Sequence, residues 1–292
     1  MMAFKNTVKT FVLLAAAGGL LVAVGSLVGG ASGALIGLAI GLALVGFTYW
    51  FSDRLAVRAA GAHEVDEASA PQLHAMVEEL AQRANLPKPR VYVSPSPQPN
   101  AFATGRSPKH AAVAVTEGLM TFCPPDQVRA VLAHEMAHIR NRDILIGSVA
   151  AAIATGISAL ANIALFAGMF GSSDDDEGQN PFATLLIAFL APVAATILQL
   201  ALSRAREFEA DRGGAEIIGD GEPLAQALLT LEARSQQVPM DLQPAQASAF
   251  IVNPITGKRV QFARLFMTHP PIEERVQRLR RMRSPQMEGV RS

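Results

Sequence analysis

Two histidines and a glutamate near the middle of the chain have the spacing of a metal-dependent hydrolase. His134, Glu135 and His138 form a His-Glu-x-x-His pattern. Residues four apart lie on one face of a helix, so both imidazoles can bind one ion while Glu135 lies one step round. Zinc lowers the pKa of water from about 15.7 to about 7, and a neighbouring glutamate can accept the proton. The alternative is a buried helix with two hydrogen-bonded histidines.

A second acidic segment offers a further ligand. A catalytic zinc site needs three protein ligands and one open position. Glu207 and Asp211 stand four apart in the segment 203–211, Ser-Arg-Ala-Arg-Glu-Phe-Glu-Ala-Asp. Glu207 can be the third ligand, and Asp211 can accept the other ring N–H of a ligating histidine. Glu209 is the competing carboxylate, and a solvated charge run at a membrane edge is the alternative for the whole segment.

Long apolar runs separate these segments and precede them. Half of the residues are hydrophobic and 17% are charged, against about 25% charged in ordinary soluble domains. A helix needs about 20 apolar residues to cross the hydrocarbon core. A cleaved signal peptide is the alternative for the first run, and buried core helices are the alternative for the last two. We expect two transmembrane hairpins, formed by runs that lie at 11–28, 34–51, 144–171 and 182–202.

Basic residues set the expected orientation. Lys and Arg flank the long polar segments and are missing from the short connectors 29–33 and 172–181. The positive-inside rule therefore predicts that the polar segments and both termini are cytoplasmic. Twenty-five basic and 25 acidic residues cancel, so no overall field favours nucleic acid. The single cysteine, Cys123, excludes an internal disulfide and is predicted to be a small apolar residue.

The chain is predicted to have four parts: a transmembrane hairpin over 1–52, a first catalytic part over 53–143, a second hairpin over 144–202 and a second catalytic part over 203–292. The two catalytic parts should fold into one domain that is mainly α with a small β-sheet. Segment 235–262 reads as a long loop. Helices are expected over 69–85, from 125 through the His-Glu-x-x-His pattern, over 221–234 and over 271–282, and strands over 90–93, 101–105 and 111–115.

Four sequence blocks in this order resemble the HtpX-type membrane metalloproteases, relatives of the CAAX prenyl endopeptidases within the gluzincin group. The blocks are 100–105 (Asn-Ala-Phe-Ala-Thr-Gly), 134–143, 203–211 and 268–275. The resemblance covers nearly the whole chain and implies one zinc ion bound by His134, His138 and Glu207, with Glu135 as the base. It also implies an enzyme of the bacterial inner membrane whose site faces the cytoplasm and which cleaves damaged or misassembled membrane proteins under stress.

Two further sites follow from the resemblance. Asn100, Ala101 and Phe102 resemble the gluzincin edge strand that pairs with the substrate backbone, since an open strand edge offers N–H and C=O groups to an extended peptide; an ordinary strand is the alternative. His269 and Arg275 resemble a pair near the scissile carbonyl, where an imidazole could donate to the developing oxyanion. A helix cap or a surface histidine is the alternative for His269.

Three rival functions remain open. An intramembrane protease would carry the His-Glu-x-x-His pattern inside an apolar run, whereas polar residues flank it here. A non-catalytic membrane scaffold would close the fourth zinc position, usually with Cys or His, and Glu135 argues against that. A prenyl-protein endopeptidase shares the catalytic residues but has more spans, enclosing a chamber. The expected partners are polypeptide substrates and the lipid bilayer; the oligomeric state does not follow from the sequence.

Overall fold

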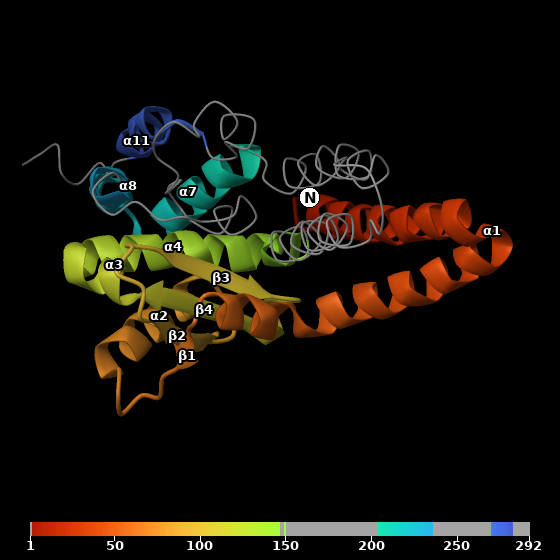
Figure 1. Ribbon diagram of the computed structural model, residues 1–292. Coiled ribbons are helices and arrows are strands. Elements are labelled where there is room, and N and C mark those ends of the chain that lie inside the picture. Colours follow the sequence, from red (N-terminus) through yellow and green to blue (C-terminus); the bar gives the residue numbers. More distant parts are fainter. Residues whose placement is uncertain (1, 147–148, 150–203, 236–269, 283–292) are drawn as a thin grey trace, which may run out of the picture.

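The protein is described by a computed structural model that covers residues 2–146, 149, 204–235 and 270–282 (Figure 1). A long apolar hairpin extends from a body built of a small sheet and several helices (Figure 1). Most of the second predicted hairpin and nearly all of the loop predicted at 235–262 lie outside the described residues.

The first element, α1 (Met2–Ala59), turns back on itself near Gly30, whose φ is +59°. Figure 1 shows its two arms, red and orange, running back toward the body. A Cβ on Gly37 would lie only 2.3 Å from the carbonyl oxygen of Leu21, and one on Gly41 would lie 3.3 Å from the backbone of the facing arm. Glycine therefore lets the two arms approach closely, as small residues do between membrane helices.

Both arms of α1 have the character of membrane helices. Two stretches, Asn6–Ala23 and Gly30–Ala59, are long and apolar enough to cross a bilayer. Only 21% of the first and 11% of the second is buried, which argues against core helices of a soluble body. Nearly all exposed large apolar side chains of the described residues lie on α1. An apolar surface of this extent is suited to contact with lipid.

The sheet has four strands in the order β1-β2-β4-β3. β1 (His63–Glu64) pairs antiparallel with β2 (Arg90–Ser94), β2 pairs parallel with β4 (Ala111–Thr116), and β3 (Ala101–Gly105) pairs antiparallel with β4. The three longer strands confirm the predicted strand positions, whereas β1 is too short to give a sequence signal. β3 is the terminal strand on one side of the sheet.

The helix that carries the His-Glu-x-x-His pattern lies at the centre of the body. Figure 1 shows α4 (Pro125–Asn141) between the sheet on one side and α7, α8 and α11 on the other. One apolar core runs from Val113 in the sheet through α4 to Leu228 and Leu279. Packing on two opposite sides therefore fixes the position of α4. The other α-helices within the described residues are α2 (Pro71–Arg83), α3 (Glu117–Phe122), α7 (Arg204–Ile218), α8 (Glu222–Ser235) and α11 (Ile272–Arg280).

The apolar hairpin is attached to the body through both of its arms. On the first arm, the side-chain amide of Asn6 donates to the carbonyl of Asn141 at the end of α4, at 3.1 Å. On the second arm, the carbonyl of Ser52 accepts from the hydroxyl of Thr104 in β3, at 3.4 Å. The two arms thus contact two different elements of the functional site.

Candidate metal centre and active site

Three predicted ligands meet between α4 and α7. The Nε2 atoms of His134 and His138 lie 3.1 Å apart, and each lies 3.8 Å from an oxygen of Glu207. One ligand atom from each residue falls within 4.8 Å of the others. Ligands held at 2.0–2.2 Å around a tetrahedral zinc ion lie about 3.3 Å apart, so this donor set fits one such ion. The competing carboxylate, Glu209, instead pairs with Arg212, at 2.5 Å.

Two consecutive glycines allow α7 to lie very close to α4. A Cβ on Gly214 would lie 2.9 Å from the backbone nitrogen of His134, and one on Gly213 would lie 2.8 Å from the Cβ of Ala137. Contacts this short exclude larger side chains unless the helices separate. The glycines therefore allow Glu207, earlier on α7, to reach the imidazoles of α4. The sequence analysis did not identify these glycines as part of the site.

A carboxylate from α7 stands behind His134. The Nδ1 atom of His134 lies 3.1 Å from Oδ1 of Asp211. Arg275 of α11 donates two bonds to the same carboxylate, from Nε at 2.8 Å and from Nη2 at 2.7 Å. Burial alone would raise the pKa of Asp211, but the Arg275 guanidinium and the His134 ring together outweigh burial and lower that pKa to about 2. Asp211 therefore stays charged and can orient the ring of His134.

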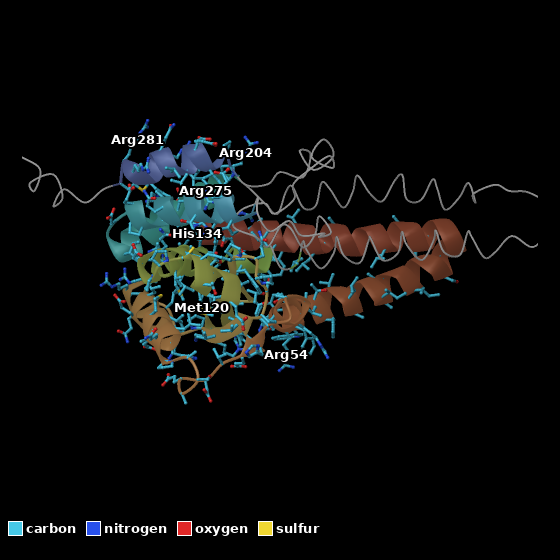
Figure 2. All side chains as sticks on the ribbon, turned by 60° about the vertical axis from the view of Figure 1, so that its left-hand side comes forward. Arg54, Met120, His134, Arg204, Arg275 and Arg281 are labelled. Atoms are coloured by element: carbon cyan, nitrogen blue, oxygen red, sulfur yellow. The ribbon has the colours of Figure 1, made fainter. Side chains whose placement is uncertain are left out.

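The structure places Arg275 behind the ligands. Its side chain is 0% exposed, and its Nη2 lies 3.8 Å from Oε2 of Glu207. The position near the scissile carbonyl that the resemblance implied stays a prediction. Figure 2 labels both Arg275, which belongs to α11, and His134, which belongs to α4. From this position Arg275 can act on the metal site through Asp211. His269, its predicted companion, lies outside the described residues.

His138 has a partner that the sequence analysis missed. Its Nδ1 lies 3.1 Å from each carboxylate oxygen of Asp143. Arg142 adopts the left-handed conformation, with φ 56° and ψ 37°, directly after α4 ends. This turn brings Asp143 back, and its N–H donates to the carbonyl of His138 at 3.3 Å. Burial alone would lower the pKa of His138, but the carboxylates of Asp143, Glu207 and Glu135 together outweigh burial and raise that pKa to about 10.

Glu135 lies between the ligands and the terminal strand of the sheet. Its Oε2 accepts the backbone N–H of Ala103 in β3, at 2.8 Å. The residue is 5% exposed, and burial raises the pKa of its carboxyl group. A raised carboxyl pKa approaches the range in which a group can accept and return a proton near neutral pH.

Alternate residues of β3 point their backbone groups in opposite directions. The carbonyl of Asn100 accepts the N–H of Thr116, so Asn100 and Phe102 direct their backbone groups toward β4. Ala101 and Ala103 direct theirs toward the other edge, where Ala103 meets Glu135. Phe102 packs with the cluster on the opposite face of the sheet. Of the three predicted substrate-binding residues, Ala101 is the one whose backbone faces the metal site.

Comparison with known proteins identifies the family. Residues 67–283 match the sequence profile of Peptidase family M48. The chain belongs to peptidase family M48. It is 49% identical over 280 residues to a Protease HtpX homolog of Pelotomaculum thermopropionicum, covering 95% of this chain and 99% of that protein. It is also 49% identical over 277 residues to a Protease HtpX homolog of Burkholderia mallei, covering 94% of this chain and 96% of that protein.

A solved structure shares the fold of this M48 chain. The crystal structure of S. mikatae Ste24p matches with a TM-score of 0.50 and 19% sequence identity, over 95% of this chain and 66% of that chain. Identity this low supports the fold alone.

The family assignment confirms the resemblance drawn from the four sequence blocks. With the cluster of His134, His138 and Glu207 and the apolar arms of α1, it makes this M48 chain a membrane zinc endopeptidase that acts on polypeptides.

Proposed function

We propose that this M48 peptidase holds one zinc ion with His134, His138 and Glu207 and hydrolyses peptide bonds with Glu135 as the general base. The observation that carries this proposal is that one atom of each ligand converges within 4.8 Å while Glu135 sits next to them on α4. Zinc bound there supplies a Lewis acid, which lowers the pKa of water and polarises the scissile carbonyl.

The proton transfers fall to Glu135. It takes a proton from the attacking water as the new C–O bond forms at the scissile carbonyl carbon. It returns that proton to the amide nitrogen as the C–N bond breaks, which leaves one fragment with a new carboxyl group and one with a new amine. Burial favours its protonated form, which helps it hold the proton between the two steps. Asp211 and Asp143 hold the two imidazoles, and Arg275 is a positioning residue that acts through Asp211.

The substrate binds as an extended strand along the outer edge of β3. Ala101 and Ala103 turn their backbone groups toward that edge, beside Glu135. Backbone pairing of this kind supplies affinity with little demand on side chains. It suits an enzyme whose substrates are damaged or misassembled proteins of differing sequence.

Membrane proteins are the proposed substrates, and the cytoplasmic face of the bacterial inner membrane is the proposed location. The exposed apolar arms of α1 support insertion in a bilayer. Lys5 and Lys9 near the start of α1 and Arg54 and Arg58 near its end support a cytoplasmic catalytic domain. The ligands on α4 and α7 come from opposite sides of the proposed second hairpin, 144–202, which would hold the site at the membrane surface.

Four purified proteins test these roles. Wild type, Glu135→Gln, Glu207→Ala and Glu209→Ala are prepared in detergent without chelators, and zinc per chain and casein cleavage are measured. We expect wild type and the matched control Glu209→Ala to hold one zinc ion and cleave casein. Glu135→Gln should hold zinc but lose about 100-fold or more in rate, and Glu207→Ala should lose both. Full zinc and activity in Glu207→Ala would remove Glu207 from the ligand set, and rapid cleavage by Glu135→Gln would remove its role as base.

A further inference from the structure

The substrate-binding strand has a fixed direction relative to the apolar hairpin. β3 begins beside Thr116, which leads into α3 at the end of the body far from the hairpin (Figure 1). It ends at Gly105, and the guanidinium of the next residue, Arg106, lies 4.7 Å from the ring centre of Trp50. Figure 1 shows the arrow of β3 pointing toward the base of α1.

Trp50 marks the level at which α1 leaves the bilayer. It is 57% exposed and stands at the end of the apolar run, with Arg54 one turn later. Tryptophan concentrates at membrane–water interfaces, and basic residues follow on the cytoplasmic side. The C-terminal end of β3 therefore lies at the interface, and its N-terminal end lies farther from the membrane.

Glu135 fixes the position of the chemistry along the strand. Its carboxylate is bonded to the N–H of Ala103, three residues before Arg106 in the sequence. A strand rises about 3.3 Å per residue, so the reacting bond lies on the order of 10 Å from the interface level. A short segment of chain is enough to bridge that distance.

An added strand prefers to run antiparallel to β3. Parallel pairing is slightly less stable per residue, and antiparallel pairs are about two to three times as common. Because β3 points toward the membrane, an antiparallel substrate has its N-terminal side at the membrane and its C-terminal side away from it.

We infer that this enzyme cleaves polypeptide tails that follow a membrane span and acts poorly on tails that precede one. The inference rests on the proposed binding of substrate to β3. A chain that leaves a neighbouring span in the N-to-C direction reaches Ala103 within about four residues. A tail that precedes a span must run past β3, turn and return, which takes on the order of 15 residues. Cleavage leaves the N-terminal fragment in the membrane and releases the C-terminal fragment.

Paired model substrates test this direction. Each has the same single span and the same unstructured tail, placed either after or before the span, with a linker of about six or about 25 residues chosen from the strand spacing. Wild type and substrate are reconstituted together in nanodiscs, and the rate and position of cleavage are measured. Glu135→Gln gives the background.

With the short linker, we expect the tail that follows the span to be cut at least about tenfold faster, because the other tail loses one or two backbone hydrogen bonds to β3. With the long linker, or with both tails released from their spans, the rates should converge. Equal rates at the short linker would overturn the inference, as would faster cleavage of the preceding tail, which would indicate parallel addition. Casein cleavage in the same preparation distinguishes failure of the proposed function from failure of this inference. If casein is not cut, the proposed peptidase function fails. If casein is cut but the two tails are cut at equal rates, only the preference for tails that follow a span is overturned.

Discussion

The two histidines of the metal site are supported in different ways. His134 has behind it Asp211 from a second helix, and Arg275 from a third helix holds that carboxylate. His138 has behind it Asp143, which stands five residues later in the same stretch of chain. The side chain of His134 is 1% exposed and that of His138 is 17% exposed. One support thus forms only when three helices have assembled, whereas the other forms at the end of a single helix.

This difference shows which half of the site depends on the whole fold. Asp211 is 2% exposed and Arg275 is 0% exposed, so neither charge can turn to water if its partner is lost. Breaking a buried pair leaves an uncompensated charge, which is costly. Asp143 is also buried, but its partner His138 can lose a proton, whereas Arg275 cannot. Substitutions on the His134 side should therefore reduce stability and metal binding together. Substitutions on the His138 side should act mainly on metal binding.

Arg275→Met should have the largest effect. It leaves the Asp211 carboxylate buried and unpaired, which costs about 3–5 kcal/mol and lowers the melting temperature by on the order of 10 °C. The zinc content per chain should fall together with the melting temperature, because His134 loses its fixed orientation. Thermal unfolding in detergent and zinc analysis measure both effects. Arg281→Gln, an exposed position just after the same helix, should leave both unchanged.

A double variant separates stability from metal binding on the His134 side. Arg275→Met combined with Asp211→Asn removes the unpaired charge, so part of the lost melting temperature should return while zinc affinity stays low. Wild-type stability and zinc content in Arg275→Met alone would show that this support is dispensable.

Gly214→Ala should have an intermediate effect. The new Cβ would meet the backbone nitrogen of His134 at 2.9 Å, and an overpacked contact costs about 1–3 kcal/mol. Since α7 also carries Glu207, its displacement should weaken zinc binding, as measured by competition with a chromogenic chelator. Arg212→Ala, on the exposed face of α7, is the control. An unchanged zinc affinity in Gly214→Ala would show that the ligand geometry does not depend on this close approach.

Asp143→Asn should have the smallest effect. The amide oxygen can still accept the ring N–H of His138, so zinc affinity should fall by about tenfold, the lower end of the range for such partners. The melting temperature should stay near that of wild type, and Asp143→Ala should bind zinc more weakly than Asp143→Asn. If Asp143→Asn lost as much stability as Arg275→Met, the proposed difference between the support of His134 and the support of His138 would be wrong.

The parts of the fold that were predicted from the sequence are those that short segments determine. Valine-rich runs gave the positions of β2 and β4, and Pro125 with the His-Glu-x-x-His pattern gave α4. The spacing of His134 and His138 identified two ligand candidates for the same reason, because four residues define one face of a helix.

The parts that were missed depend on backbone conformation or on distant contacts. Asp143 reaches His138 only because Arg142 is left-handed, a conformation that is uncommon for arginine. Gly213 and Gly214 weaken a helix by propensity, so their value lies in a contact with α4 that no local pattern reveals. The pair of Asp211 and Arg275 joins residues 64 positions apart. Spacing alone also left Glu207 and Glu209 as competitors.

The attachment of α1 has a mechanical consequence. One arm is bonded through Asn6 to the end of the ligand helix, and the other is bonded through Ser52 to the strand that carries Ala103. The open end of the hairpin therefore spans the ligand helix and the strand that we propose binds the substrate. In the proposed membrane location, lateral pressure that presses the arms together or lets them separate would change the spacing of those two elements.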